Sequence, residues 1–204
     1  KRVLVPASAV SDAWRGGQAF DDSAWIQGAG GVGFERDSGY EPFFKIDVES
    51  QMYGRNTTCY IRIPFTLSTG QLASLSRLAL KVRVDDGFIA YLTGTEVARK
   101  NFTGNPQWNS AAGALNSDAA AVIFEEFEIS THLGRLRQGG NILAIHAMNN
   151  TAGSSDFLLG VELASSAAPA GGVPSGVSQT AQRYVQPMVL AHSAHVKARA
   201  LAGT

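Results

Sequence analysis

The feature that most constrains this chain is a series of short segments in which apolar and polar residues alternate, with glycine-rich turns between them. Apolar residues occupy every second position over residues 59–65, 78–84 and 157–163. Because successive side chains of a strand point to opposite faces, this alternation predicts half-buried β-strands. Residues 141–148 are largely apolar on both faces, which is typical of a central sandwich strand. The 22 glycines predict the frequent turns that short strands need.

Further segments extend the strand pattern. The motif at residues 85–87, Asp-Asp-Gly, bends the chain before residues 88–92, and Thr93-Gly94-Thr95 turns it back as in a hairpin. Residues 122–129 predict another strand, and residues 100–120 predict a long loop of small polar residues. With at least six short strands, the expected fold class is all-β, an antiparallel jelly-roll β-sandwich.

The first 45 residues are rich in glycine and aromatic residues and lack helical periodicity. Within them, residues 20–25 predict a turn, capped by Asp21 or Asp22, that aims Trp25 at a core. Trp14 is likewise expected to be a core anchor. Residues 28–33 contain four glycines but neither follow a clear strand nor precede a helical pattern. They predict tight turns rather than a dinucleotide-binding loop, which needs that strand and helix on either side.

Charge and cysteine content exclude several classes of function. Lys and Arg total 17, as do Asp and Glu, so no overall field attracts nucleic acid or an anionic membrane. No stretch approaches the roughly 18 apolar residues of a membrane span, so membrane insertion is not expected. Cys59 is the single cysteine, which rules out an internal disulfide and a zinc site built from clustered thiolates.

The composition changes near the C-terminus and predicts three parts. Residues 1–164 form the sandwich, residues 165–180 are an Ala/Ser/Gly/Pro-rich linker, and residues 181–204 form an incomplete β unit. The last part has two strand-like pieces, residues 184–190 and 194–201, and two strands alone are marginally stable in water. We therefore expect this unit to dock on the sandwich, pair with a partner, or belong to a truncated domain.

Five pieces of the sequence carry a resemblance to a known family. They are Trp14-Arg15-Gly16-Gly17, Phe20-Asp21-Asp22-Ser23-Ala24-Trp25, Gly30 to Arg36, Asp85 to Asn101, and Gly140 to Ile145 with Ser154-Ser155-Asp156 behind it. With these pieces in order along residues 3–163, the chain resembles a domain of large secreted proteins of Planctomycetes-type bacteria, where it accompanies CotH-like and lamin-tail-like modules. Family members usually have Asn where this chain has Thr93.

The same order of pieces also resembles galactose-binding-like jelly rolls, including the N-terminal domain of family 2 glycoside hydrolases. The tail, with Tyr184, Pro187 and residues 196–200, is similar to the end of a chitobiase C-terminal-like repeat. These resemblances imply a jelly-roll sandwich in an exported, extracellular or cell-surface protein, and they leave the ligand open.

Two features are candidate binding sites. Asp85 and Asp86 can offer hard oxygen ligands to calcium, or their side chains can accept hydrogen bonds from backbone amides at a bend. Trp108 lies among amide and hydroxyl side chains in the long loop, where it can stack on a sugar ring or fold the loop back onto the sandwich. Trp108, Asn101 and Asp85 are the candidate ligand-binding residues, and Asp85 and Asp86 the candidate calcium ligands.

The sequence carries no catalytic signature. The adjacent pairs Asp21-Asp22 and Glu125-Glu126 point to opposite faces of a strand, so neither forms the facing carboxylates of a glycosidase. There is no Gly-x-Ser-x-Gly elbow. His146 lies in an apolar strand and is expected in the core, and the spacing of His192 and His195 does not bring them together on a strand.

The leading interpretation is a non-catalytic accessory module of an exported bacterial protein that binds polysaccharide or a cell-surface glycan. The competing interpretation is a structural module that joins neighbouring domains or copies of itself through strand edges and the C-terminal tail. A sugar-cleaving enzyme is the third class, and it requires a pair of facing carboxylates.

Overall fold

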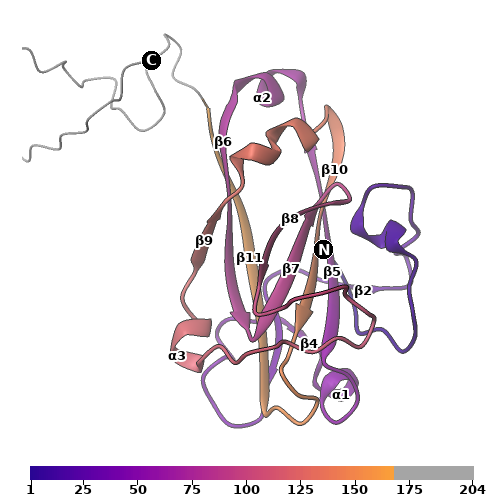
Figure 1. The fold of residues 1–204 in the computed structure, drawn as a ribbon, viewed down its shortest axis with the longest axis vertical. Coiled ribbons are helices and arrows are strands. Elements are labelled where there is room, and N and C mark those ends of the chain that lie inside the picture. The colour runs from indigo at the N-terminus through magenta and orange to yellow at the C-terminus, as the bar shows by residue number, and fades with distance from the viewer. Residues whose placement is uncertain (168–204) are drawn as a thin grey trace, which may run out of the picture.

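Two β-sheets packed face to face make up the part of the chain that the computed structural model describes, residues 1–167 (Figure 1). This confirms the predicted all-β sandwich. Residues 168–180 of the expected linker and the expected unit at residues 181–204 lie outside the described residues. The last strand continues to Ala167, three residues beyond the expected end of the sandwich at residue 164.

One sheet has six strands, and all of its neighbouring strands run antiparallel. Its longest pairing joins β5 to β10 over ten residues, from Thr58 opposite Met148 to Leu67 opposite Gly139. In spatial order the strands are β2 (Ile26–Gln27), β1 (Arg2–Leu4), β5 (Thr58–Leu67), β10 (Gly139–Met148), β7 (Gly87–Leu92) and β8 (Thr95–Lys100).

The second sheet has five strands and one parallel pair, β3 with β4. Its centre is the long antiparallel pairing of β6 with β11. The chain passes between the two sheets repeatedly, for example from β5 to β6, from β6 to β7 and from β10 to β11. In spatial order the strands are β4 (Ile46–Asp47), β3 (Val32–Glu35), β11 (Asp156–Ala167), β6 (Leu75–Asp85) and β9 (Glu125–Glu128).

The helices are short and lie at the ends and sides of the sandwich (Figure 1). None in the described part of the chain is long and apolar enough to cross a membrane. At α2, Ser68 and Gln71 form a capping box, each side chain bonding the other residue's backbone N–H. The helices are η1 (Asp12–Arg15), α1 (Glu49–Met52), α2 (Thr69–Ser74), α3 (Asp118–Ala121) and η2 (Ser130–Arg135).

The main core lies between the two sheets and is built from the alternating apolar residues. Ile61, Leu80 and Phe157 are fully buried there, and each such side chain contributes about 1.5–3 kcal/mol on leaving water. The ring of Phe88 on β7 meets that of Phe127 on β9 edge to face at 5.2 Å, so an aromatic pair joins the sheets.

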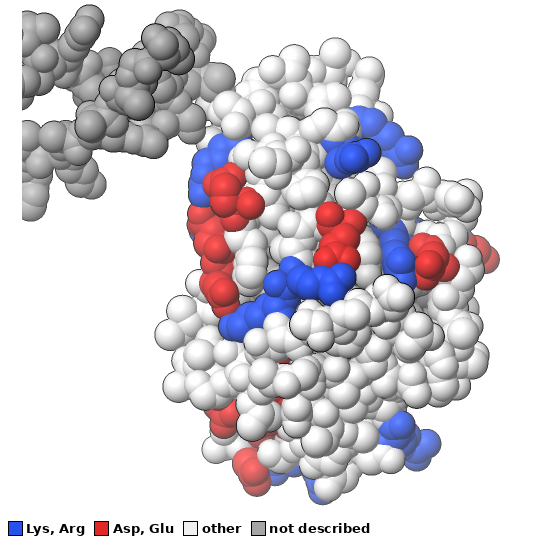
Figure 2. Space-filling view, viewed as in Figure 1, with Lys and Arg blue, Asp and Glu red and all other residues white. Residues whose placement is uncertain are grey.

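Charged side chains gather over the edge of the sandwich that carries β8 and β9. Figure 2 shows red and blue residues side by side on this face, with uncharged surface around them. Lys100 on β8 pairs with Glu125 on β9 at 2.7 Å and so links the edge strands of the two sheets. Paired charges at a sheet edge also oppose pairing with another chain.

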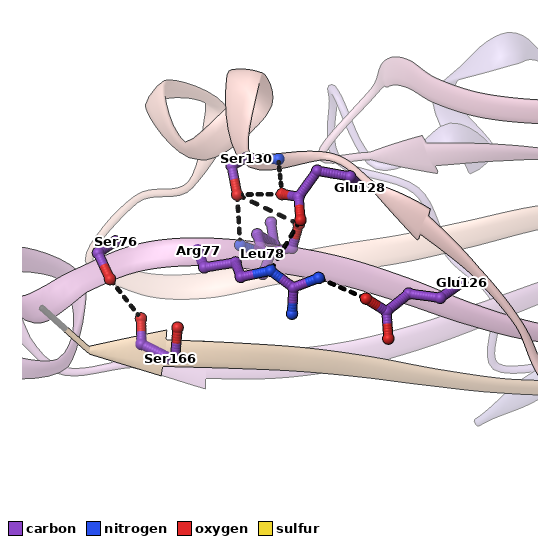
Figure 3. A network of polar contacts seen from close by, with 7 residues as sticks. All are labelled: Ser76, Arg77, Leu78, Glu126, Glu128, Ser130 and Ser166. Carbon is purple, nitrogen blue, oxygen red and sulfur yellow. Dashed lines mark hydrogen bonds and ion pairs between the residues drawn. The ribbon is translucent and has the colours of Figure 1, made fainter. Parts of the chain in front are cut away.

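Figure 3 shows the contacts that hold β9 and η2 against β6. Arg77 on β6 reaches both Glu126 and Glu128 on β9, the latter at 2.8 Å. The backbone N–H of Leu78 donates to Ser130 Oγ at 2.8 Å. Because the ion pairs are exposed, they add little stability, and they fix the placement of β9 instead.

Two segments differ from the sequence expectation. Residues 1–47, where turns are expected, contain four short strands, each only two to four residues long. The predicted strand at residues 122–129 is a strand only over Glu125–Glu128, and Asp118–Ala121 before it are helical. Ile129 is buried in the main core, although it lies just beyond the strand.

Candidate functional site

A second apolar cluster lies on the outer face of the six-stranded sheet, away from the main core. Its centre is Trp14, which stacks on Tyr60 of β5 with 4.1 Å between ring centroids and 16° between ring planes. Trp14 and Trp25 are 1% and 8% exposed, so both are the core residues that the sequence predicts. The buried members of this cluster are Trp14, Trp25, Tyr60, Ile89, Tyr91, Ala112, Ala144 and Met148.

Two glycines allow η1 to lie directly on the sheet. Gly16 ends the helix with φ of +94°, and a Cβ there would lie 2.5 Å from Cβ of Ile142. Gly94, in the β7–β8 turn, has φ of +88°, and its Cβ would lie 2.5 Å from Cα of Gly17. The backbone N–H of Gly94 then donates to the carbonyl of Arg15 at 2.9 Å. Only glycine permits both the left-handed conformation and this close approach.

A buried arginine holds the N-terminal segment from the sheet side. Arg62 on β5 is 4% exposed, and its Nη1 donates to the carbonyl of Trp14. Its Nε pairs with Asp22 Oδ2 at 2.7 Å. The turn at residues 21–25 forms as predicted, since Asp21 Oδ1 accepts from the N–H of Ser23 at 2.9 Å. Arg62 therefore anchors both η1 and this turn to β5.

Residues just before and at the start of β5 position the loop that contains Trp108. Asn56, 7% exposed, donates from Nδ2 to the carbonyls of Pro6 and Trp108 at 2.6 and 3.3 Å. Thr57 and Thr58 each donate from Oγ1 to the carbonyl of Ser110 at 2.8 Å. One short segment thus fixes the N-terminal segment and the loop beside each other.

A cavity of about 360 Å³ lies between these two segments on the outer face of the sheet. Trp108 and Tyr60 provide aromatic surface there, and Trp108 is half-buried. Asp12, Arg15, Asn105 and Gln107 supply polar groups, but all of residues 101–117 are uncharged. The lining is made by Ala9, Val10, Asp12, Arg15, Tyr60, Asn105, Pro106, Gln107 and Trp108, and we call it the η1 pocket.

The charges of the η1 pocket come from a single ion pair. Arg15 Nη2 lies 2.8 Å from Asp12 Oδ1, one helical turn earlier. The guanidinium also lies over the ring of Tyr91, with 4.8 Å from Cζ to the ring centroid. Burial raises the pKa of Tyr60 to about 12, against the opposing effect of Arg15, so its phenol is a neutral hydrogen-bonding group at physiological pH.

His146 lies beneath the aromatic cluster and is uncharged at neutral pH. Burial, and secondarily the charge of Arg15, lowers its pKa to about 3. Its Nε2 is 3.0 Å from Thr58 Oγ1, while its Nδ1 has no hydrogen-bond partner among the described residues. Its ring meets Tyr60 edge to face at 4.8 Å. The structure confirms the expected core position, and the imidazole supports Tyr60 from below.

The three candidate ligand residues do not form one site. Trp108 lines the η1 pocket, whereas Asn101 donates from Nδ2 to the carbonyl of Asp86 at 3.0 Å and serves the fold. Asp85 is 3% exposed and shares the outer face of the other sheet with Leu158, its partner on β11. A carboxyl buried there has little surface to offer a glycan, so this geometry does not favour Asp85 as a ligand residue, and its role in binding stays a prediction.

Asp86, but not Asp85, adopts the alternative that the sequence left open, a side chain that accepts hydrogen bonds from backbone amides at the bend. Asp86 Oδ1 accepts from the N–H of Asn116 and Oδ2 from the N–H of Asn150, both at 2.8 Å. Within residues 1–167, no group of three or more His, Cys, Asp or Glu side chains is arranged to hold a metal ion. Calcium at Asp85 and Asp86 stays a prediction that this geometry does not support.

The state of Asp85 follows from its burial. Desolvation, followed by the neighbouring side chain of Asp86 and by Asp156, raises the pKa of Asp85 to about 9. The carboxyl is therefore protonated at neutral pH. Tyr40, 1% exposed, lies near it, and burial raises the pKa of this phenol too, with a smaller contribution from Asp85 once its carboxyl ionises at alkaline pH. This neutral group belongs to the packing of the second sheet rather than to a site.

Sequence reasoning missed most of the η1 pocket. Asp12, Arg15 and Tyr60 were not singled out as binding residues, although Arg15 stands in the Trp-Arg-Gly-Gly motif that carried the family resemblance. Asn105 and Gln107 both shortly precede Trp108 in the predicted loop, and only their closeness to Trp108 could have pointed to them.

Comparisons with known proteins give structural neighbours only. No family model and no curated protein matches the chain. A β-glucuronidase of Bacteroides uniformis matches with a TM-score of 0.44 and 16% identity, covering 78% of this chain and 16% of that one. An α-L-rhamnosidase of Streptomyces avermitilis has a TM-score of 0.38 and 19% identity, over 55% and 9% of the two chains. A β-D-mannosidase of Dictyoglomus thermophilum has a TM-score of 0.30 and 17% identity, over 45% and 9%.

This chain therefore corresponds to a small part of each neighbour, 9–16% of its length.

Proposed function

We propose that this chain is a non-catalytic carbohydrate-binding module that takes a sugar unit of a polysaccharide or surface glycan in the η1 pocket. The observation that carries the proposal is the lining of this cavity, where a half-buried indole and a neutral phenol adjoin two amide side chains and an ion pair. The C–H face of a sugar packs on aromatic rings, while its hydroxyls need several donors and acceptors at fixed positions.

The pocket's residues divide this work by their chemistry. Trp108 offers a ring face for stacking, and Asn105 and Gln107 offer amide donors and acceptors to sugar hydroxyls. The stack on Trp14 already fixes the side chain of Tyr60 in the free protein. A ligand that contacts this phenol therefore does not have to order the side chain on binding. A volume of about 360 Å³ is at the small end of ligand sites and suits one or two sugar rings.

The pocket favours binding over hydrolysis. Glycoside hydrolysis needs two carboxyl groups about 5–10 Å apart on either side of the scissile bond. Asp12 is the one carboxylate that lines the η1 pocket. We therefore place the chain among accessory modules, and the family resemblance adds the proposal that it works in an exported or cell-surface bacterial protein.

Affinity electrophoresis of the chain through gels containing single polysaccharides tests this function. We expect at least one polymer to retard the protein, and Trp108→Ala to abolish the retardation by removing the stacking surface. Tyr53→Ala is the matched control, because Tyr53 is a 39% exposed aromatic residue outside the pocket. Its loss should leave the retardation unchanged.

Two results would contradict the proposal. If no polymer in a broad panel retards the protein, the η1 pocket is not a glycan site. If Trp108→Ala is retarded like the unaltered chain, the binding surface lies elsewhere. A size in solution that grows with concentration, in the same experiments, would favour the structural interpretation.

A further inference from the structure

The charge of the η1 pocket is set by two residues on one helical turn. Arg15 and Asp12 are the charged residues of its lining, since the loop over residues 101–117 has no Asp, Glu, Lys or Arg. Selection between charged and neutral sugars in this pocket therefore depends on how this one pair is held.

The two partners are held very differently. The guanidinium of Arg15 is fixed over the ring of Tyr91, and its side chain is 23% exposed. The Asp12 side chain is 75% exposed, so water solvates most of it. The ion pair therefore joins a fixed cation to a carboxylate that can turn into solvent with little loss.

The guanidinium also has unused donor capacity. Arg15 Nε is buried and has no hydrogen-bond partner in residues 1–167, and Asp12 is the only carboxylate there within ion-pair distance of this side chain. A guanidinium has five N–H donors in a planar fork that matches a carboxylate with two parallel hydrogen bonds. Nε itself is closed to solvent, so a ligand in the pocket would use the Nη1 and Nη2 donors, of which Nη2 already lies against Asp12.

We infer that the η1 pocket selects a carboxylated sugar, a uronic acid unit of an acidic polysaccharide, whose carboxylate takes the place of Asp12 on the guanidinium of Arg15. This rests on the proposed glycan-binding function and adds the class of sugar. The ring of the uronic acid packs on Trp108, and its carboxylate accepts from Arg15. The bound glycan excludes water from the pocket, and the lower local dielectric strengthens this charge-assisted contact.

The experiment compares acidic polymers with the same polymers after reduction of their carboxyl groups. Polygalacturonate, alginate and hyaluronan are each cast in gels beside their carboxyl-reduced forms and beside a sulfated dextran, at low and high salt. We expect an acidic polymer to retard the protein about tenfold more strongly than its reduced form, which keeps the sugar and linkage but lacks the charge. Retardation should weaken as salt rises.

Three variants locate the effect. Arg15→Gln should lose the preference for the acidic polymer, while Arg55→Gln, an exposed arginine outside the pocket, should keep it. Asp12→Asn should bind the acidic polymer several-fold more tightly, because the competing carboxylate is gone. This variant changes a highly exposed side chain, so it tests the inference even if Arg15→Gln fails to fold.

The outcomes separate the inference from the proposed function. One outcome is that neutral polymers retard the protein as strongly as acidic ones or more strongly, and that the retardation is lost in Trp108→Ala. That result would support the glycan site and overturn the inferred selection of a carboxylated sugar. Preference for sulfated dextran over every carboxylated polymer also overturns it. If Asp12→Asn binds the acidic polymer no more tightly than the unaltered chain does, then Asp12 contacts the sugar itself, and the inferred replacement of Asp12 by the ligand's carboxylate is overturned. Retardation by none of the polymers overturns both proposals.

Discussion

The indole of Trp14 stacks on the phenol ring of Tyr60 at 4.1 Å, and this contact joins the N-terminal segment to the six-stranded sheet. Tyr60 lines the η1 pocket and also contacts Trp14 through its ring face and His146 edge to face. The floor of the candidate site is therefore the surface of a second core, and the site forms only when that core is packed.

This stack predicts that Trp14→Ala destabilises the chain although Trp14 lies outside the main core. Deleting a large buried aromatic side chain costs about 3–5 kcal/mol from lost burial and the cavity left behind. Urea denaturation measures the change. Trp108→Ala, at a half-buried position, is the control and should lose much less. Equal losses in the two variants would contradict the importance of the stack.

The close approach of Gly94 to Gly17 predicts unequal effects of two alanine substitutions. Gly94 and Gly104 have nearly the same φ, +88° and +83°, but only at Gly94 does a Cβ meet backbone, 2.5 Å from Cα of Gly17. Gly104→Ala should cost about 1–2 kcal/mol from the left-handed conformation alone. Gly94→Ala should cost more and also weaken glycan retardation, because η1 must shift.

Thermal unfolding of both variants, together with affinity electrophoresis, checks this prediction. Similar losses in stability for Gly94→Ala and Gly104→Ala would mean that the two backbones are not in close contact.

Asp85 predicts a loss of stability on the alkaline side. Its pKa is about 9 in the folded chain and near 3.9 in the unfolded one, so between these values the folded state binds a proton that the unfolded state has lost. Stability therefore falls as pH rises through this window, by up to about 1.4 kcal/mol per pH unit. Asn resembles the protonated acid, so Asp85→Asn should match the unaltered chain at pH 4 and exceed it at pH 9.

Urea unfolding at several pH values tests the role of Asp85. The exposed Asp37, changed to Asn, is the matched control and should follow the unaltered chain. Parallel curves for Asp85→Asn and the unaltered chain would show that the carboxyl of Asp85 is ionised in the fold.

For His146 we expect the opposite pH dependence of stability, a loss on the acid side. Its folded pKa of about 3 lies below the unfolded value near 6.5, so the unfolded state binds the extra proton between them. Stability is fully present above pH 6.5 and falls as pH drops toward 3, by up to about 1.4 kcal/mol per unit. His146→Gln should flatten this limb, whereas His132→Gln should not. An imidazole NMR signal of His146 that titrates near pH 6 would contradict the lowered pKa on which this prediction rests.

The strands were predictable because their signal is local. Residues 59–65, 78–84, 141–148 and 157–163 all lie in strands of the sandwich. The strands before residue 48 were missed because they have two to four residues, too few to show alternation. The helix at Asp118–Ala121 was missed because a stretch of four small residues has no periodicity of its own.

The β-sandwich and the buried positions of Trp14, Trp25 and His146 could be predicted from the amino-acid sequence alone. These follow from the order of side chains along a strand or turn, which each segment carries in its own residues. Tertiary structure alone decided the η1 pocket. Its lining comes from residues 9–15, 60 and 105–108, and no spacing within one segment records that these three meet on the same face of a sheet.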